Sequence, residues 1–318
     1  MDKTLCEQFD TLRKYLPDDS SNSTTSDINK LGNAKNYCSN EESGDTECKT
    51  DLDNINAGCL WLLEQLFVKN SKNISTVEYI IIWLSYKLNQ KKYDGINNLN
   101  DFYKKYIENN RHYTNCKQGG QDCSGSLSSN TGYNNYKEII NKRKSLLNIN
   151  IKNMSKIYDA FKLLCNMYTE LNANSTISEE SLGNAKNFVK KYKELNDDST
   201  INGDGSYKQV LSTLSIDYIN FKSSCADSDD CNKIPSLTSS ETEENGMQSS
   251  KNICDDTPSL SIAKKLILAL LIFMFVICIT EKSSKRIFKR KTKKYKEENE
   301  SLIYYSKSIN YFRNSNND

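Results

Sequence analysis

The placement of its cysteines constrains the fold of this 318-residue chain more than any other sequence feature. Ten of the eleven cysteines precede an apolar run near the C-terminus, and the eleventh, Cys278, lies inside that run. An even number of cysteines on one side of such a run indicates disulfides formed in an oxidising compartment. The candidates for disulfide bonding are Cys6, Cys38, Cys48, Cys59, Cys116, Cys123, Cys165, Cys225, Cys231 and Cys254.

A metal site is the alternative interpretation of these cysteines. Zinc-binding cysteines and histidines recur at short spacings such as Cys-x-x-Cys. The chain contains no such pair, and its only histidine is His112. The sequence therefore predicts disulfides and neither a metal nor another cofactor, and it leaves the pairing of the cysteines open.

The apolar run from Leu266 to Ile279 is 14 residues long, which suits a buried core helix as well as a membrane span. The surrounding sequence favours the membrane span. Ser259 to Thr280 gives 22 residues, roughly 33 Å of helix, which is enough for a hydrocarbon core of ~30 Å. Lys264 and Lys265 lie near enough to the end of the segment for their ammonium groups to reach the headgroups. We expect one transmembrane helix over residues 259–280.

Nine basic residues follow this segment with no acidic residue among them. Such a cluster marks the cytosolic side of a membrane helix and adheres to anionic lipid. A nucleic-acid-binding patch is the alternative, but it requires a tail that is free of the bilayer, so we expect no nucleic-acid partner. The residues expected to contact the membrane surface are Lys282, Lys285, Arg286, Lys289, Arg290, Lys291, Lys293, Lys294 and Lys296.

The N-terminus conflicts with this topology, because MDKTLCEQFDTLRKYL lacks the apolar core of an ordinary signal peptide. The opposite topology would leave ten cysteines in a reducing compartment. Since the cysteines and the basic cluster agree with each other, we expect the N-terminal domain outside and the C-terminal tail in the cytosol. Targeting by the internal helix, or by a signal of another kind, is then required.

Apolar periodicity predicts an all-α domain upstream of the membrane segment. Residues Cys59–Val68 and Val77–Leu88 are apolar on nearly every side, which indicates buried central helices. Shorter amphipathic helices are expected over Leu99–Ile107, Leu182–Leu195 and Tyr207–Phe221. Alternating strand patterns are nearly absent. The predicted fold is an irregular, disulfide-linked helical bundle followed by one transmembrane helix.

The longest predicted helix runs from about Tyr136 to Leu171. Its apolar residues recur at spacings of four and three over three heptads. A coiled-coil dimer and a helix packed into its own domain both explain this seam, and the short repeat favours the second. The seam consists of Leu147, Ile151, Met154, Tyr158, Phe161, Cys165 and Tyr168.

Segments rich in Ser, Asn, Asp and Gly are expected to interrupt or leave the bundle. Residues 17–27 and 117–132 are predicted loops, and the longer acidic stretch at 226–257 indicates a flexible stalk. The predicted organisation is a helical cysteine-rich domain at 1–225, a stalk at 226–258, a transmembrane helix at 259–280 and a basic tail at 281–318.

Catalytic motifs are missing from the sequence. It has no Gly-x-Ser-x-Gly elbow, no phosphate-binding P-loop and no Gly-x-Gly-x-x-Gly turn. His112 fits a surface or loop position better than a catalytic one. Residues Asp198–Gln209 resemble a calcium loop only weakly, since Gln209 stands where the closing Glu is needed. We expect a non-enzymatic protein.

Several stretches of the chain together resemble the PIR proteins, the large variant multigene family of malaria parasites, and especially its rodent-parasite branch. The resemblance covers close to the full length, with gaps in the Ser/Asn-rich loops and the stalk, and the membrane segment also fits. The resembling stretches are MDKTLCEQFDTLRKYLPD, TECKTDLDNINAGCLWLLEQLF, YIIIWLSYKLNQKK, LNDFYKKYI, NIKNMSKIYDAFKLLCNMYTELN, FVKKYKELN, SYKQVLSTLSIDYINFKSSC and the basic tail RIFKRKTKKYKEE.

The resemblance implies a helical, disulfide-linked ectodomain and export into or onto the infected red cell. It also implies a role at the host–parasite interface in antigenic variation, immune evasion or adhesion, with a host receptor or an antibody as partner. Members of the family typically lack an ordinary signal peptide. By analogy, the ten upstream cysteines contain the structural pairs.

We therefore expect a variant surface protein whose loops at residues 17–30 and 117–132 are exposed on a helical scaffold. The alternative is a membrane scaffold that acts through its basic tail on lipid or on the host cytoskeleton. Truncation of residues 281–318 distinguishes the two, because loss of function with retained surface exposure favours the tail.

Overall fold

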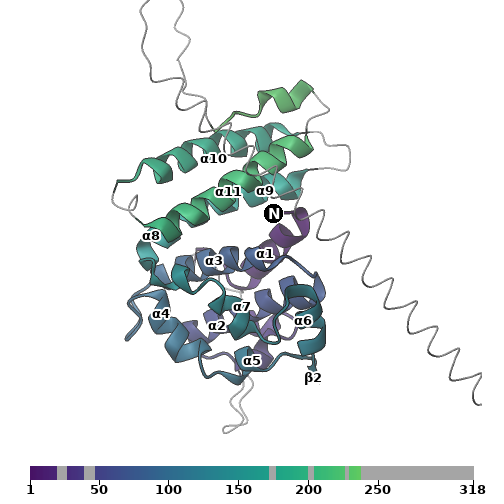
Figure 1. Cartoon of the computed structure of the whole chain (residues 1–318), viewed down its shortest axis with the longest axis vertical. Coiled ribbons are helices and arrows are strands. Elements are labelled where there is room, and N and C mark those ends of the chain that lie inside the picture. The colour runs from purple at the N-terminus through teal and green to yellow at the C-terminus, as the bar shows by residue number, and fades with distance from the viewer. Residues whose placement is uncertain (20–26, 39–46, 172–176, 200–203, 226–228, 238–318) are drawn as a thin grey trace, which may run out of the picture. The chain divides into compact units, whose positions relative to one another are not determined.

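The computed structural model describes residues 1–19, 27–38, 47–171, 177–199, 204–225 and 229–237, and these residues are mostly helical (Figure 1). The α-helices are α1 (Lys3–Tyr15), α2 (Asp51–Leu63), α3 (Val77–Asn89), α4 (Leu99–Phe102), α5 (Arg111–Thr114), α6 (Ser124–Thr131), α7 (Tyr136–Asn141), α8 (Ile151–Ser155), α9 (Ile157–Glu170), α10 (Glu179–Asp197) and α11 (Gly205–Ser224). Two π-helical segments, η4 (Glu64–Lys69) and η6 (Tyr103–Ile107), directly continue α2 and α4. The 3-10 turns are η2 (Ile28–Lys30), η3 (Ala34–Cys38), η5 (Ile74–Thr76), η7 (Lys144–Asn148) and η8 (Asp229–Lys233), and the strands are β1 (Lys117–Gln118) and β2 (Gln121–Asp122).

Helices α2 and α3 form the centre of the domain, as the sequence predicts for its two most apolar segments. Every residue from 55 to 67 is buried. The two helices approach closely at Gly58, where an added Cβ would lie 2.9 Å from the ring of Trp83. A side chain at this position would therefore force α2 and α3 apart. Helix α2 begins at a capping box, in which Thr50 and Asp53 satisfy each other's backbone N–H groups.

Helix α9 connects the N-terminal helices to the last helices of the domain. On one side it packs against α1, with the rings of Phe9 and Phe161 4.8 Å apart, and the Cys6–Cys165 disulfide joins the same two helices. On the other side it contacts α10 and α11, and the three helices lie side by side in Figure 1. The ring of Tyr168 on α9 meets Phe221 of α11 at 5.2 Å.

Two buried carboxylates tie α11 to the rest of the fold. Glu78 on α3 is 1% exposed and accepts hydrogen bonds from Arg143 Nε at 2.6 Å and from Thr213 Oγ1 at 2.8 Å. Asp217 on α11 accepts a hydrogen bond from the hydroxyl of Tyr79 and pairs with the α-amino group of Met1 at 2.5 Å. Buried charges need such partners, because an unpaired charge in the interior is very costly. Each carboxylate therefore links segments that are far apart in the sequence.

The predicted long helix over 136–171 is wrong, because the structure breaks it into α7, η7, α8 and α9. Ile149 and Asn150 have extended backbones with ψ of 138° and 133°, and the side chain of Asn150 accepts a hydrogen bond from the N–H of Lys152. Asn competes for backbone groups in this way and favours helix caps over helix interiors. The apolar seam is nevertheless buried at every one of its seven positions, so the predicted packing into the domain's own core is what the structure shows.

Residues 117–132 differ from the predicted loop. They form the short antiparallel pair β1–β2 and the helix α6. The end of the segment 17–30, which was expected to be an exposed loop, is also structured, since η2 covers residues 28–30 and Ile28 is buried. Residues 20–26 lie outside the described part of the chain.

The domain boundary predicted at residue 225 also differs from the structure. Residues 229–237 pack against α11, because Cys231 is bonded to Cys225 and the hydroxyl of Tyr218 donates to the carbonyl of Pro235 at 2.7 Å. None of the helices within the described ranges is both long enough and apolar enough to cross a membrane. The predicted transmembrane helix at 259–280 and the basic tail at 281–318 lie outside those ranges.

Candidate recognition surface

A disulfide-closed hairpin is the most exposed structured segment that sequence analysis singles out. We call residues Lys117–Asp122 the hairpin surface. Gly119 and Gly120 connect its two strands with φ of 57° and 85°, the left-handed conformations that a two-residue hairpin turn requires and that glycine adopts without strain. Five of its six residues are exposed and Gln118 is half-buried. Side chains here meet solvent rather than the core.

The base of the hairpin surface is fixed covalently and by packing. Cys116 and Cys123 form a disulfide and are only 3% and 5% exposed. Their backbones are also joined, since Cys123 N–H donates to Cys116 C=O at 3.1 Å. Asp122 accepts hydrogen bonds from the backbone and the hydroxyl of Ser124, which lower the pKa of its carboxyl group. The hairpin therefore projects from an anchored stem.

Helix α6 carries this stem onto the π-helical segment η4. Leu127 of α6 is fully buried, and Asn130 Nδ2 donates to the carbonyl of Phe67 at 2.9 Å. A π-helix shifts the backbone hydrogen-bond pattern by one residue, and here a side chain from another helix contacts a carbonyl inside the shifted turn. The hairpin is thus mounted on a segment whose first four residues, 64–67, are buried.

A polar cluster around Glu64 lies at the start of the same π-helical segment. Glu64 is fully buried, accepts hydrogen bonds from the hydroxyl of Tyr37 and from Asn33 Nδ2 at 2.7 Å, and pairs with Lys69 Nζ at 2.9 Å. Burial and the neighbouring carboxylate raise the pKa of the Tyr37 hydroxyl far above its usual value, so this hydroxyl remains a donor. The half-buried His112 meets Tyr37 edge-on, with ring centroids 5.7 Å apart. This arrangement is a packed network rather than an open catalytic site.

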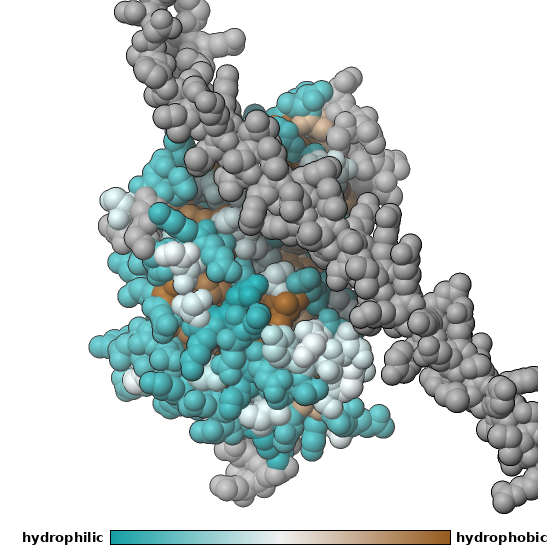
Figure 2. Space-filling view, viewed as in Figure 1, coloured by the Kyte–Doolittle hydropathy of each residue, from teal (hydrophilic) through white to brown (hydrophobic). Residues whose placement is uncertain are grey.

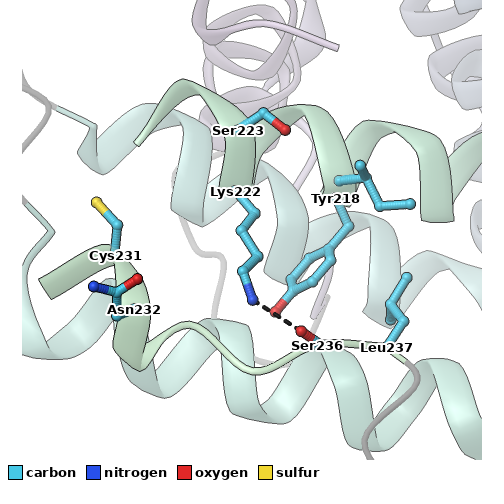
Figure 3. Close-up of a pocket in the computed structure, with 8 residues that line it drawn as sticks. Tyr218, Lys222, Ser223, Cys231, Asn232, Ser236 and Leu237 are labelled. Atoms are coloured by element: carbon cyan, nitrogen blue, oxygen red, sulfur yellow. Dashed lines mark hydrogen bonds between the residues drawn. The ribbon is translucent and has the colours of Figure 1, made fainter. Parts of the chain in front are cut away.

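A second disulfide clip closes the end of the described domain, beside the pocket drawn in Figure 3, which Cys231 helps to line. The Cys225–Cys231 bond folds η8 back on α11, and Lys222 Nζ donates to Ile234 C=O at 2.8 Å and to Ser236 Oγ at 2.9 Å. A cavity of about 460 Å³ lies between these segments. Ile219 on its rim is 54% exposed and Ile216, one turn earlier, is 46% exposed. Elsewhere the face drawn in Figure 2 is largely hydrophilic, with only small apolar areas.

The described residues offer no group of three His, Cys, Asp or Glu side chains that could hold a metal ion. The carboxylates at the domain's centre are instead occupied by hydroxyl, amide and cationic partners. The arrangement as a whole supports presentation of surface residues on a rigid base.

The family model of the Plasmodium variant antigen proteins Cir/Yir/Bir matches residues 6–280 of the chain. The chain belongs to the Cir/Yir/Bir family. A solved structure described as a Plasmodium PIR protein ectodomain is 30% identical, with a TM-score of 0.52. That match covers 74% of this chain and 98% of the solved one. No curated protein matches. The resemblance to PIR proteins found in the sequence is thereby confirmed, and so is the mostly helical, disulfide-linked fold.

Within this Cir/Yir/Bir chain, the structure pairs eight of the ten candidate cysteines. Sequence spacing left the pairing open, because three of the disulfides close short loops while the fourth joins residues 159 positions apart. The pairs are Cys6–Cys165, Cys38–Cys48, Cys116–Cys123 and Cys225–Cys231.

Cys59 was one of the cysteines predicted to form disulfides, and the structure does not pair it. It is unpaired among the described residues and 1% exposed, since it lies in the middle of the buried helix α2. Burial raises the pKa of its thiol to about 12. Free cysteine behaves as a small apolar residue in such a position. Cys254 and the nine basic residues predicted to contact the membrane surface lie outside the described residues.

Three buried carboxylates were not identified from the sequence, namely Glu64, Glu78 and Asp217. Apart from Lys69, which lies five residues after Glu64, the partners named above come from positions 27 to 216 residues away, which no local pattern reveals. Only Glu78 could have been recognised from the sequence, since a carboxylate inside the apolar segment Val77–Leu88 is expected to be buried and to need a partner.

Proposed function

We propose that this Cir/Yir/Bir chain is a non-enzymatic variant surface protein at the host–parasite interface, and that the hairpin surface is one of its recognition sites. A single observation carries this proposal. Six mainly exposed residues, four of them polar and two of them glycine, lie between two buried, mutually bonded cysteines. Such a loop can change its sequence without changing the core, which is what antigenic variation, immune evasion and adhesion each require of a surface.

Sequence variation in the hairpin surface is energetically tolerable because its exposed residues contribute little to the stability of the core. Substitutions at exposed positions away from caps and cores usually change stability by less than about 0.5 kcal/mol. Substitutions in a core cost several times more. The hairpin stem, by contrast, depends on Cys116, Cys123 and Leu127, whose burial fixes the orientation of the loop. Antibodies or a host receptor are the proposed partners of the loop residues.

We further propose that residues 259–280 anchor the chain in a membrane as a single pass. The proposed topology places the helical domain outside the infected red cell and the basic tail in the cytosol, against anionic lipid. The 22-residue segment with its 14-residue apolar run, and the nine basic residues after it, support this arrangement. A tail that acts on lipid or cytoskeleton remains the second hypothesis.

Paired variants of the full-length chain test the recognition site. Lys117→Gln with Gln121→Ser changes the hairpin surface and keeps both glycines and both cysteines. We expect antibodies raised against the wild-type domain to bind cells displaying this variant several-fold less, with the thermal unfolding of the protein unchanged. The matched control is Lys104→Gln with Asn109→Ser, which changes two other exposed residues of the same kinds. Equal loss of binding in both variants contradicts the proposal.

Labelling of intact infected cells with a membrane-impermeant reagent tests the topology. We expect reaction of residues in the helical domain and protection of the tail. Reaction of the tail alone contradicts the proposed topology. Removal of residues 281–318 then separates the two functions, because a scaffold acting through its tail loses its effect while its domain stays labelled.

A further inference from the structure

Helix α10 presents a row of lysines to solvent beside the last described segment of the chain. Lys186, Lys190 and Lys193 follow one another at spacings of four and three residues, so they lie on one face of the helix and span roughly 10.5 Å along its axis. All three are exposed. With Asn187, Val189 and Pro235 they line a cavity of about 630 Å³, which we call the α10 groove.

The lysines of this row outnumber the two carboxylates of the groove, Glu194 and Asp197, which lie at its C-terminal end. None of the three lysines makes a hydrogen bond or an ion pair to another described residue. Lys191, on a different face of the same helix, lies 3.5 Å from Asp159 and 3.9 Å from Glu194. The groove lysines thus differ from their neighbour in having their ammonium groups available to a ligand.

We propose that the α10 groove binds a linear sulfated polysaccharide. Charge complementarity favours an anionic partner, and the arrangement of the charges selects its class. Three ammonium groups in a row match a polymer with repeated charges better than one small anion, which needs donors that converge on a single point. Lysine is a point charge without the fork geometry with which arginine recognises a carboxylate in a bidentate manner. The groove contains no arginine.

The remaining lining residues point to the same class. The groove lacks an aromatic side chain among its described residues, so bases of a nucleic acid would find no stacking surface. It also lacks the large exposed apolar anchors that dominate most peptide interfaces. Val189 and Pro235 instead provide a small apolar floor for the C–H faces of sugar rings, and the amide of Asn187 offers hydrogen bonds to hydroxyl groups. Glu194 and Asp197 repel anions at the C-terminal end of the groove, which confines the ligand to the part over residues 186–193.

The experiment is a lysine footprint of the full-length chain in lipid nanodiscs, with a heparin oligosaccharide as the probe. An amine-acetylating reagent modifies exposed lysines, and mass spectrometry resolves each position, so binding at the basic tail does not obscure the groove. We expect acetylation of Lys186, Lys190 and Lys193 to fall several-fold with heparin. The exposed lysines Lys30, Lys35 and Lys104, which make no ion pair to described residues, should react at an unchanged rate.

Two triple variants give a second readout. K186Q/K190Q/K193Q should weaken the heparin binding of the helical domain about tenfold, as measured by the heparin concentration that protects the domain's remaining lysines near the groove. K30Q/K35Q/K104Q removes the same charge elsewhere and should leave that concentration unchanged. Both variants keep all buried residues, and matching thermal unfolding shows that they are folded.

Four results overturn the proposal. Unchanged acetylation of the groove lysines in heparin, with protection only in the tail, shows that the groove does not bind it. Equal protection by desulfated heparin shows that sulfate is not recognised. Equal protection by a Glu-rich peptide makes an acidic peptide the occupant, and equal protection by phosphatidylserine vesicles makes a lipid surface the occupant.

Discussion

Lys87 is the one lysine of the described domain that is almost completely buried, at 2% exposure. Its ammonium group donates to the carbonyl of Pro17, and burial lowers its pKa to about 8, with Arg13 and Lys162 adding to this effect and Asp18 opposing it. The burial of Lys87 could not be predicted from the sequence, because Lys87 lies near the end of an apolar helix, where a lysine normally reaches solvent. Its environment is set by the turn at Pro17, 70 residues earlier in the chain.

We expect the stability of the wild type, relative to that of Lys87→Met, to rise as the pH increases from about 8 to 10. In this range the unfolded chain still holds the Lys87 proton while the folded domain has released it, so higher pH favours the folded state. A pKa lowered from 10.5 to about 8 corresponds to on the order of 3 kcal/mol over the full range. Urea unfolding of the wild type and of Lys87→Met at several pH values measures the effect.

Lys87→Met removes the ammonium group and keeps an unbranched apolar side chain of similar volume, so it should remove the contribution of Lys87 to the pH dependence with little loss of packing. The contribution of buried tyrosines is common to both proteins and cancels in the comparison. Parallel stability curves for the two proteins between pH 8 and 10 contradict the assignment to Lys87.

Cys59 gives a second prediction at the residue scale. Its thiol is buried and its pKa is raised to about 12. The reactive thiolate is therefore scarce at pH 8, and an alkylating reagent in solution cannot reach the sulfur. We expect iodoacetamide to leave Cys59 unmodified in the folded, unreduced protein and to modify it fully in urea. Peptide mass spectrometry measures both. Rapid modification of Cys59 in the folded protein would show that α2 opens more readily than its packing indicates.

At the scale of elements, the sequence predicts the presence of the helices better than it predicts where they end. Helix α3 agrees with its predicted span, because its apolar residues leave no polar face and only burial satisfies them. The segment from 136 to 171 kept its predicted apolar seam but not its continuity. Heptad spacing indicates which side chains are buried, but it does not indicate where a helix ends. The helix is interrupted at Asn150, which caps α8. In the sequence, an Asn that caps a helix cannot be distinguished from an Asn on a helix surface.

The hairpin disulfide provides a prediction for a single element. Closing a loop of 8 residues stabilises the folded state by about 2.5 kcal/mol in the chain-entropy model. In Cys116→Ala with Cys123→Ala we expect at most this loss in the free energy of unfolding, together with much faster tryptic cleavage after Lys117. The helical circular dichroism should persist, since the two strands contain only two residues each.

The control is Cys38→Ala with Cys48→Ala, which removes another short-range disulfide and leaves the hairpin closed. Faster cleavage after Lys117 in the control as well would show that the hairpin is not an independent element.

At the scale of the whole molecule, the Cys6–Cys165 disulfide has a different role. It joins α1 to α9 across 159 residues, and the Phe9–Phe161 contact reinforces the same junction. The chain-entropy model assigns a loop of this length about 5 kcal/mol. Cys6→Ala with Cys165→Ala should therefore cost roughly twice the stability lost at the hairpin, measured by urea unfolding followed by circular dichroism. A smaller loss than at the hairpin contradicts this ranking.

The sequence by itself determined the all-α class, the buried central helices, the use of cysteines as disulfides and the family. Apolar periodicity and cysteine placement are local or compositional properties, and these are the properties that a sequence displays directly. It also predicted that residues 117–132 form an exposed segment, although not the hairpin within it.

Only the tertiary structure decided which cysteines pair, that Cys59 has no disulfide partner among the described residues, and which partners bind Glu64, Glu78 and Asp217. It also placed three lysines of α10 beside Pro235 in one groove. The physical reason is the same in each case. Whether two groups bond depends on their separation in space, and the packing of α1, α3 and α11 around α9 brings together residues that the chain keeps far apart.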